Sequence, residues 1–256
     1  MYAKLKIAYD GASFYGFQKQ VDSVYTVAGT IEYALNKLFK QKTTVIGAGR
    51  TDKGVHATGQ VVGFKMPFFI GVNALKKALT SLLPESISIL SISYQDQRFH
   101  AIQDAVAREY HYCITTHKEI PVYLKPYVVS LPGTNIDDLM ECLSLFYGDH
   151  NFAAFCSNRK DMFDTHCSIY DVSVKSTFQN TLPFAEMKTH IYSVCFLGRS
   201  FLYKMIRHLL GAGFACLQGH LSLCDLRIML KTGHRHKNWS LAPARGLFLT
   251  DVHYKS

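Results

Sequence analysis

One short stretch of the sequence combines a carboxylate, two cations and several glycines. Residues 47–61 read GAGRTDKGVHATGQV, and Asp52 lies there between Arg50 and Lys53. Glycines permit unusual backbone angles and let a ligand approach closely, and a nearby arginine favours the ionised form of a carboxylate. We therefore identify Asp52 as a candidate catalytic residue. The alternative is an ordinary loop aspartate that pairs with an amide or with an arginine.

The same stretch contains two candidate substrate contacts, His56 and Lys53. For His56, a structural hydrogen bond is an equally good interpretation.

A second pattern is AREYHY, residues 107–112. On a strand, Arg108, Tyr110 and Tyr112 point to the same side. Tyrosine rings beside an arginine make a surface on which a nucleic-acid base can stack. The alternative is an aromatic strand that packs its own core, and this is as good an interpretation for Tyr112.

A third pattern is the apolar helix predicted from SFLYKMIRHLLGAG, residues 200–213, because Arg207 falls inside its apolar run. A buried arginine needs an anionic partner, and we expect that partner to be Asp52. An arginine at the helix edge whose charge reaches water is the alternative.

No metal site is predicted. His234 and His236 are close in sequence but lack a third ligand, so we interpret them as part of a solvated basic loop. None of the seven cysteines forms a CxxC pair, which argues against both a zinc site and a disulfide framework. Reduced thiols indicate a cytoplasmic protein.

The elements that must position these residues follow from hydrophobic periodicity. The first part of the chain predicts the order β-α-β-β-α-β, typical of ferredoxin-like and RNA-recognition modules. Thr26 is expected to cap the first helix, Pro84 to end the second, and the last strand has a phase slip between Ile89 and Leu90. The predicted elements are strands at 4–9, 43–46, 60–66 and 86–94, and helices at 26–40 and from Val72 to Leu82.

The second part of the chain predicts a looser alternation of strands and helices. We expect two α/β halves, 1–105 and 106–256, that share one mixed, mainly antiparallel sheet. The predicted elements are strands at 106–114, 170–174, 186–196 and 246–254, and helices at 135–148, 201–217 and 223–231.

Composition limits the kind of partner. The chain has 256 residues, 48% of them hydrophobic, and a net charge of +9. This supports a sizeable core and a basic surface that suits a polyanion such as a nucleic acid. No apolar run is long enough to span a membrane, and the beginning, MYAKLKIAYDG, is read as a strand and not as a signal peptide.

Seven motifs together resemble the TruA family of tRNA pseudouridine synthases, over nearly the whole chain. They are YDGASFYGFQKQ (9–20), TVAGTIEYAL (26–35), GAGRTDKGVHATGQV (47–61), RFHAIQDAVAREYHY (98–112), GDHNFAAFC (148–156), FLYKMIRHLLG (201–211) and PARGLFLTDVHY (243–254). The chain departs from the family pattern at Phe17, where tryptophan is usual, and at Ile102 and Gln103, where Ala-Arg is usual.

The resemblance implies the pseudouridine synthase fold, with two ferredoxin-like or RRM-like halves and a central active-site cleft. It implies a homodimer without a cofactor that converts uridine to pseudouridine at positions 38 to 40 of the tRNA anticodon arm. Asp52 would be the catalytic aspartate and Tyr110 would stack on the target uracil. Arg207 would pair with Asp52, and Arg50 would hold the flipped-out nucleotide.

Two other functions fit part of the sequence. A non-enzymatic RNA-binding module would explain the charge and the aromatic residues, but not Asp52 together with a helical Arg207. A metal-dependent phosphodiesterase would need further carboxylates near Asp52, and the loop has none.

Overall fold

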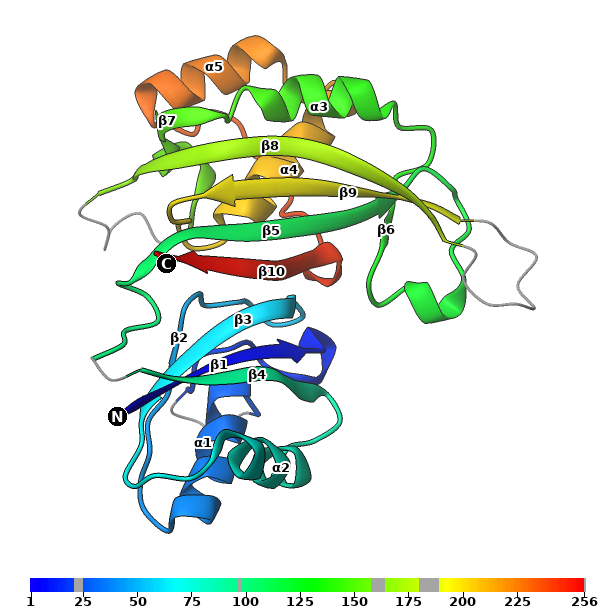
Figure 1. The fold of residues 1–256 in the computed structure, drawn as a ribbon. Coiled ribbons are helices and arrows are strands. Elements are labelled where there is room, and N and C mark those ends of the chain that lie inside the picture. Colours follow the sequence, from blue (N-terminus) through cyan, green and yellow to red (C-terminus); the bar gives the residue numbers. More distant parts are fainter. Residues whose placement is uncertain (21–24, 96–97, 158–163, 180–188, 256) are drawn as a thin grey trace. The chain divides into compact units, whose positions relative to one another are not determined.

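The computed structural model describes residues 1–20, 25–95, 98–157, 164–179 and 189–255. The chain divides into two compact units (Figure 1): unit 1 is Met1–Arg108 with Phe248–Ser256, and unit 2 is Glu109–Leu247. The division of the sequence into halves 1–105 and 106–256 stays a proposal, and the two units are described separately below.

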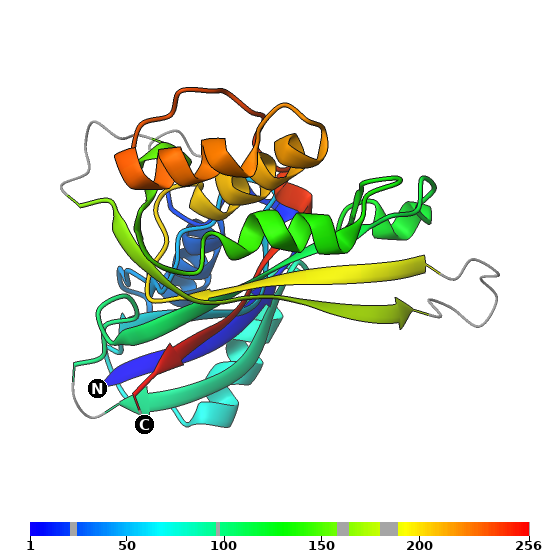
Figure 2. The ribbon, with the colours of Figure 1, turned by 90° about the horizontal axis from the view of Figure 1, so that it is seen from above.

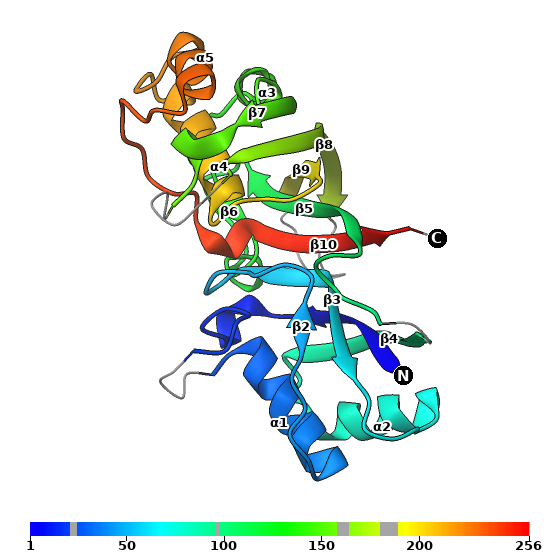
Figure 3. The same cartoon turned by 90° about the vertical axis from the view of Figure 1, so that its left-hand side faces the viewer.

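Unit 1 contains the predicted order β-α-β-β-α-β, joined by the last strand of the chain. Its sheet has the strand order β4-β1-β3-β10, with the short β2 on β3. β1 is antiparallel to β3 and β4, and β10 is parallel to β3. Both helices lie on one face of this sheet (Figure 3). The elements are β1 (Tyr2–Tyr9), α1 (Val27–Phe39), β2 (Ile46–Gly47), β3 (His56–Lys65), α2 (Val72–Leu82), β4 (Ile87–Gln95) and β10 (Leu247–Tyr254).

Local sequence signals explain most of unit 1. Every second residue of β1 is buried, as its alternation predicts. Thr26 caps α1 by accepting a hydrogen bond from the backbone of Gly29. The predicted phase slip in β4 is a β-bulge, because the register against β1 shifts so that Leu90 has no partner. The bulge keeps apolar side chains on the core side both before and after it.

The strand predicted at 43–46 is wrong for most of its length, because β2 is only Ile46–Gly47. The backbone N–H of Thr43 donates to the side chain of Asn36, and that of Val45 donates to Glu32, both on α1. Helix side chains therefore satisfy backbone groups that a strand ladder would otherwise use.

Unit 2 consists of strands with helices on one side. Its strand order is β5-β9-β8-β7, with β6 parallel to β5. β8 is antiparallel to β7 and β9. Figure 2 shows α3, α4 and α5, in green, gold and orange, on the same side of these strands. The elements are β5 (Ala105–Thr115), β6 (Val129–Ser130), α3 (Ile136–Ser144), β7 (Gly148–Asn151), β8 (His166–Gln179), β9 (Thr189–Gly198), α4 (Met205–Leu217) and α5 (Leu223–Thr232).

The helix predicted from Phe201 begins later, at Met205. Lys204 directly before it has a φ of 59°, in the left-handed region, so the right-handed helix cannot extend through it. The short strands β6 and β7 were not predicted, and the expected start of β9 at Glu186 lies outside the described residues. Among the described residues, no helix is both long and apolar enough to cross a membrane.

Candidate functional site

Asp52 begins a tight turn in unit 1. The backbone N–H of Val55 donates to the carbonyl oxygen of Asp52 at 3.1 Å, and Gly54, the third residue of the turn, has a φ of +80°. This geometry is typical of a type II turn, which favours glycine at that position. Gly54 therefore serves to define the turn, and Asp52, which is half-buried, has a fixed backbone position.

The base of the Asp52 loop is held by two buried polar side chains. Gln60, fully buried, donates from Nε2 to the Gly49 carbonyl at 2.7 Å. Arg108, 7% exposed, donates from Nε to the Ala48 carbonyl at 3.1 Å and from its guanidinium to the Ile102 carbonyl at 3.0 Å. The sequence predicted a base-stacking role for Arg108, but its guanidinium instead anchors backbone carbonyls.

The YDGASFYGFQKQ motif packs directly against this loop. The Tyr9 hydroxyl lies 2.8 Å from the Thr51 hydroxyl, and the Phe17 backbone N–H donates to the Thr51 carbonyl at 3.0 Å. Gly16 has a φ of +94°, and a Cβ there would lie 2.9 Å from the same carbonyl. A Cβ at Gly47 would collide with the Phe17 ring at 2.2 Å. These two motifs of the sequence are therefore one packed structure.

His56 lies inside unit 1 and is 1% exposed. Its Nδ1 accepts a hydrogen bond from the Gly11 backbone at 3.1 Å, and its ring stacks on Phe248 with centroids 4.7 Å apart. This agrees with the structural alternative, because a ligand would reach the ring only if the surrounding residues moved.

The two cations beside Asp52 are exposed. Arg50 is open to solvent. Lys53 is exposed too, and its ammonium group lies 3.9 Å from the ring centroid of Tyr15, which itself is half exposed. This surface of unit 1 can therefore offer positive charge and an aromatic face to a nucleic acid.

In unit 2, Tyr110 and Tyr112 lie on the same side of β5, as predicted, but in different surroundings. Tyr110 is 7% exposed and meets Phe201 edge to face at 5.3 Å. Tyr112 is fully buried, donates to the Pro243 carbonyl at 2.9 Å and lies near the ring of Phe214. Burial raises the pKa of the Tyr112 hydroxyl well above its usual value. Tyr112 is thus a core residue, not part of a stacking surface.

Arg207 lies in the first turn of α4 and is half-buried. Its Nε donates to the Ala242 carbonyl at 2.9 Å, and the Ala242 N–H donates to the Arg207 carbonyl at 3.1 Å. Asp52 belongs to unit 1 and Arg207 to unit 2, and their pairing stays a prediction.

The basic loop around residues 234–237 agrees with the interpretation as a solvated segment. His234, His236 and Lys237 are exposed. His236 and Lys237 both contact the carboxylate of Asp225, at 3.0 and 2.9 Å.

One group of side chains that could hold a metal ion was not predicted from the sequence. Glu109, His111 and Cys195 in unit 2 place one ligand atom each within 4.8 Å of one another. Glu109 and Cys195 are 86 residues apart in sequence, so no spacing motif could have found the group.

Comparison with known proteins gives a consistent result over nearly the whole length. A protein-family model described as tRNA pseudouridine synthase matches residues 6–103 and 143–255. Three relatives named tRNA pseudouridine synthase A come from Phytoplasma mali, Brevibacillus brevis and Bacillus subtilis. They are 35%, 35% and 33% identical, and the alignments cover 98%, 97% and 99% of this chain and the same shares of the relatives.

Proposed function

Because the chain belongs to the family of tRNA pseudouridine synthases, we propose that it isomerises uridine to pseudouridine at positions 38 to 40 of the tRNA anticodon stem-loop, with Asp52 as the catalytic aspartate. The observation that carries the role of Asp52 is its place at the start of a glycine-defined turn whose base is anchored by Gln60 and Arg108. Such anchoring holds a reacting group in position before the substrate binds.

The reaction suits a single carboxylate. The glycosidic bond between C1′ and N1 breaks, the uracil turns, and a bond forms between C1′ and C5. The C5 proton leaves and N1 gains a proton, so there is no net oxidation or reduction. Asp52 either attacks the substrate or removes a proton from the sugar, and the reaction itself requires no cofactor.

Three other residues complete the proposed site. Tyr110 stacks on the flipped-out uracil, because an aromatic face compensates for the lost stacking in the RNA. Arg50, exposed beside Asp52, holds the flipped nucleotide. Lys53 is a further substrate contact.

Arg207 pairs with Asp52 in this proposal. The first turn of a helix carries a partial positive charge, which disfavours cations there and favours an anion. Lys204 nevertheless directly precedes α4, and Arg207 lies in its first turn. An anionic partner such as a carboxylate would offset this repulsion.

The proposal includes a cytoplasmic homodimer. All seven cysteines are free, which fits a reducing compartment, and the dimer follows from the family resemblance. Light scattering after size-exclusion chromatography tests it: twice the chain mass is expected, and a single chain mass at all concentrations would contradict it.

The function is tested by mapping pseudouridine on unmodified tRNA transcripts, using carbodiimide labelling and primer extension with EDTA present. We compare the wild type with Asp52→Asn, which keeps the side-chain shape, and with Asp138→Asn, an exposed aspartate on α3. We expect product in the anticodon stem-loop from the wild type and from Asp138→Asn. Asp52→Asn should lower the rate roughly 10⁴-fold or more while still binding tRNA.

The other outcomes separate the alternatives. If the wild type binds tRNA but makes no pseudouridine, the chain is an RNA-binding module. If EDTA abolishes the reaction, the chemistry depends on a metal. Full activity of Asp52→Asn would exclude Asp52 as the catalytic residue.

A further inference from the structure

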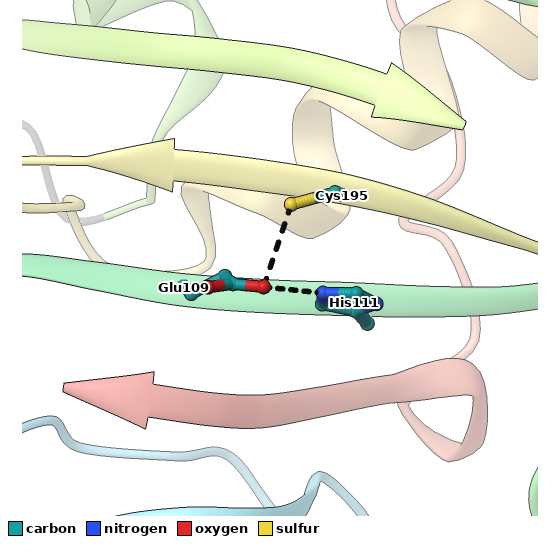
Figure 4. A group of neighbouring side chains, drawn as sticks. All are labelled: Glu109, His111 and Cys195. Carbon is teal, nitrogen blue, oxygen red and sulfur yellow. Dashed lines mark hydrogen bonds and ion pairs between the residues drawn. The ribbon is translucent and has the colours of Figure 1, made fainter. Parts of the chain in front are cut away.

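Glu109, His111 and Cys195 form a compact cluster on one face of the unit 2 sheet. Glu109 and His111 are alternate residues of β5, so their side chains point to the same side. Cys195 lies on β9, the neighbouring strand. Figure 4 shows the three side chains pointing toward one another across the two strands.

The distances are close to those that one metal ion needs. Glu109 Oε1 lies 2.7 Å from His111 Nε2 and 3.8 Å from Cys195 Sγ. On a tetrahedral zinc ion, with bond lengths of 2.0 to 2.3 Å, neighbouring ligand atoms are about 3.4 to 3.6 Å apart. To accommodate the ion, the ligand atoms of Glu109 and His111 would have to move apart by less than about 1 Å, which a small side-chain rotation provides.

A hydrogen bond already orients the imidazole for this role. His111 Nδ1 lies 2.7 Å from the hydroxyl of Ser193 on β9, and Nε2–H donates to the Glu109 carboxylate at 2.7 Å. When zinc takes Nε2, the imidazole proton moves to Nδ1, which can then donate to the Ser193 oxygen. Histidines that bind metals are usually held in this way by their second ring nitrogen.

The donor set identifies the class of ion. A thiolate, an imidazole and a carboxylate together favour zinc over the hard cations calcium and magnesium. Cys195 is buried, whereas the side chains of Glu109 and His111 are 26% and 18% exposed, so a water molecule can reach a fourth position.

We propose that Glu109, His111 and Cys195 form a zinc site that joins β5 to β9, with water as the fourth ligand. On binding, the sulfur–zinc bond forms as the thiol proton leaves to solvent. The ligands flank Tyr110, whose side chain points to the opposite face, so the ion would fix the strand that carries this residue. The site does not depend on the proposed function, because it makes no use of Asp52.

The test uses the full chain, freed of metal with a chelator and then titrated with zinc and, separately, with cobalt as a spectroscopic probe. We expect saturation at one equivalent, and a near-ultraviolet band from thiolate to cobalt charge transfer. Cys195→Ser should abolish the band, and Glu109→Gln should weaken binding at least tenfold. Ser193→Ala, which removes only the orienting hydroxyl, should weaken it roughly 10- to 100-fold. Zinc should also raise the Tm of the wild type.

The control is Cys224→Ser, which removes an exposed thiol on α5 and should leave the band and the stoichiometry unchanged. Circular dichroism checks that each variant is folded. Two results would overturn the proposal. The first is that the wild type shows no saturable binding, so that Glu109 and His111 only contact each other. The second is that the wild type and Cys195→Ser bind zinc equally well.

Discussion

The two units present their proposed functional residues in different ways. In unit 1, Asp52 begins a turn, and the backbone carbonyls just before that turn accept hydrogen bonds from two buried side chains, Gln60 and Arg108. In unit 2, Tyr110 is placed by the regular pleat of β5 and by contact with the ring of Phe201. A residue positioned by a few directional hydrogen bonds should respond sharply to the loss of one of them. A residue positioned by apolar packing should respond gradually.

The largest effect expected from this difference is at Arg108. Arg108→Met keeps an apolar stem but leaves the Ala48 and Ile102 carbonyls without their guanidinium partner. We expect kcat to fall by about 10²-fold, because the loop that carries Asp52 shifts, and the free energy of unfolding to fall by about 2–4 kcal/mol. Single-turnover kinetics and urea unfolding measure the two effects.

The control for Arg108 is Tyr254→Phe. It removes a comparable hydrogen bond, from the Tyr254 hydroxyl to the Ala101 carbonyl at 2.8 Å, without touching the Asp52 loop. It should lose stability but keep kcat. If kcat fell by the same factor in both variants, the loss of activity would come from lower overall stability, and the contrast between the units would fail.

Tyr110 should give the next largest effect, and a graded one. Tyr110→Ala removes the proposed stacking surface and should weaken binding of the anticodon stem-loop by about 1–3 kcal/mol. Tyr110→Phe keeps the ring and should lose much less affinity. Fluorescence titration with the isolated stem-loop measures both. Equal affinities for all three proteins would show that Tyr110 does not stack on the RNA.

Smaller effects are expected from the exposed cations of unit 1. Arg50→Gln and Lys53→Gln should each lower the magnitude of the slope of log K against log [salt] for tRNA binding by about 0.7–0.9, if each contacts one phosphate. Lys77→Gln, on the exposed side of α2, is the control. If the effect is specific to the Asp52 loop, this variant should leave the slope unchanged. An unchanged slope for Arg50→Gln would exclude its phosphate contact.

The smallest functional effect should come from Tyr112, two residues from Tyr110. Tyr112→Phe removes the bond to the Pro243 carbonyl and should lower the free energy of unfolding by about 1–3 kcal/mol. The rate with saturating tRNA should stay the same, because the hydroxyl is fully buried. A loss of rate without a loss of stability would mean that Tyr112, and not only Tyr110, contributes to the site.

Sequence patterns predicted those parts of the fold that depend on neighbours along the chain. The alternation in β1, the cap at Thr26 and the bulge at Leu90 are local features, and each is confirmed. The predictions failed where a distant contact or an unusual backbone angle intervened. The backbone near Thr43 bonds to α1 instead of forming a strand, and the left-handed Lys204 delays the start of α4.

For the candidate site, the sequence by itself determined which residues belong to the family motifs, including Asp52, Arg50, Tyr110 and Arg207. It also determined the turn at Gly54, because only glycine readily adopts the positive φ that this turn requires.

Only the tertiary structure decided what similar residues do. It made Arg108 an anchor for a loop 60 residues earlier, buried Tyr112 entirely while Tyr110 remains 7% exposed, and brought Cys195 beside Glu109. The physical reason is that burial and hydrogen bonding depend on strands paired across long stretches of chain, whereas periodicity and turn chemistry are properties of adjacent residues.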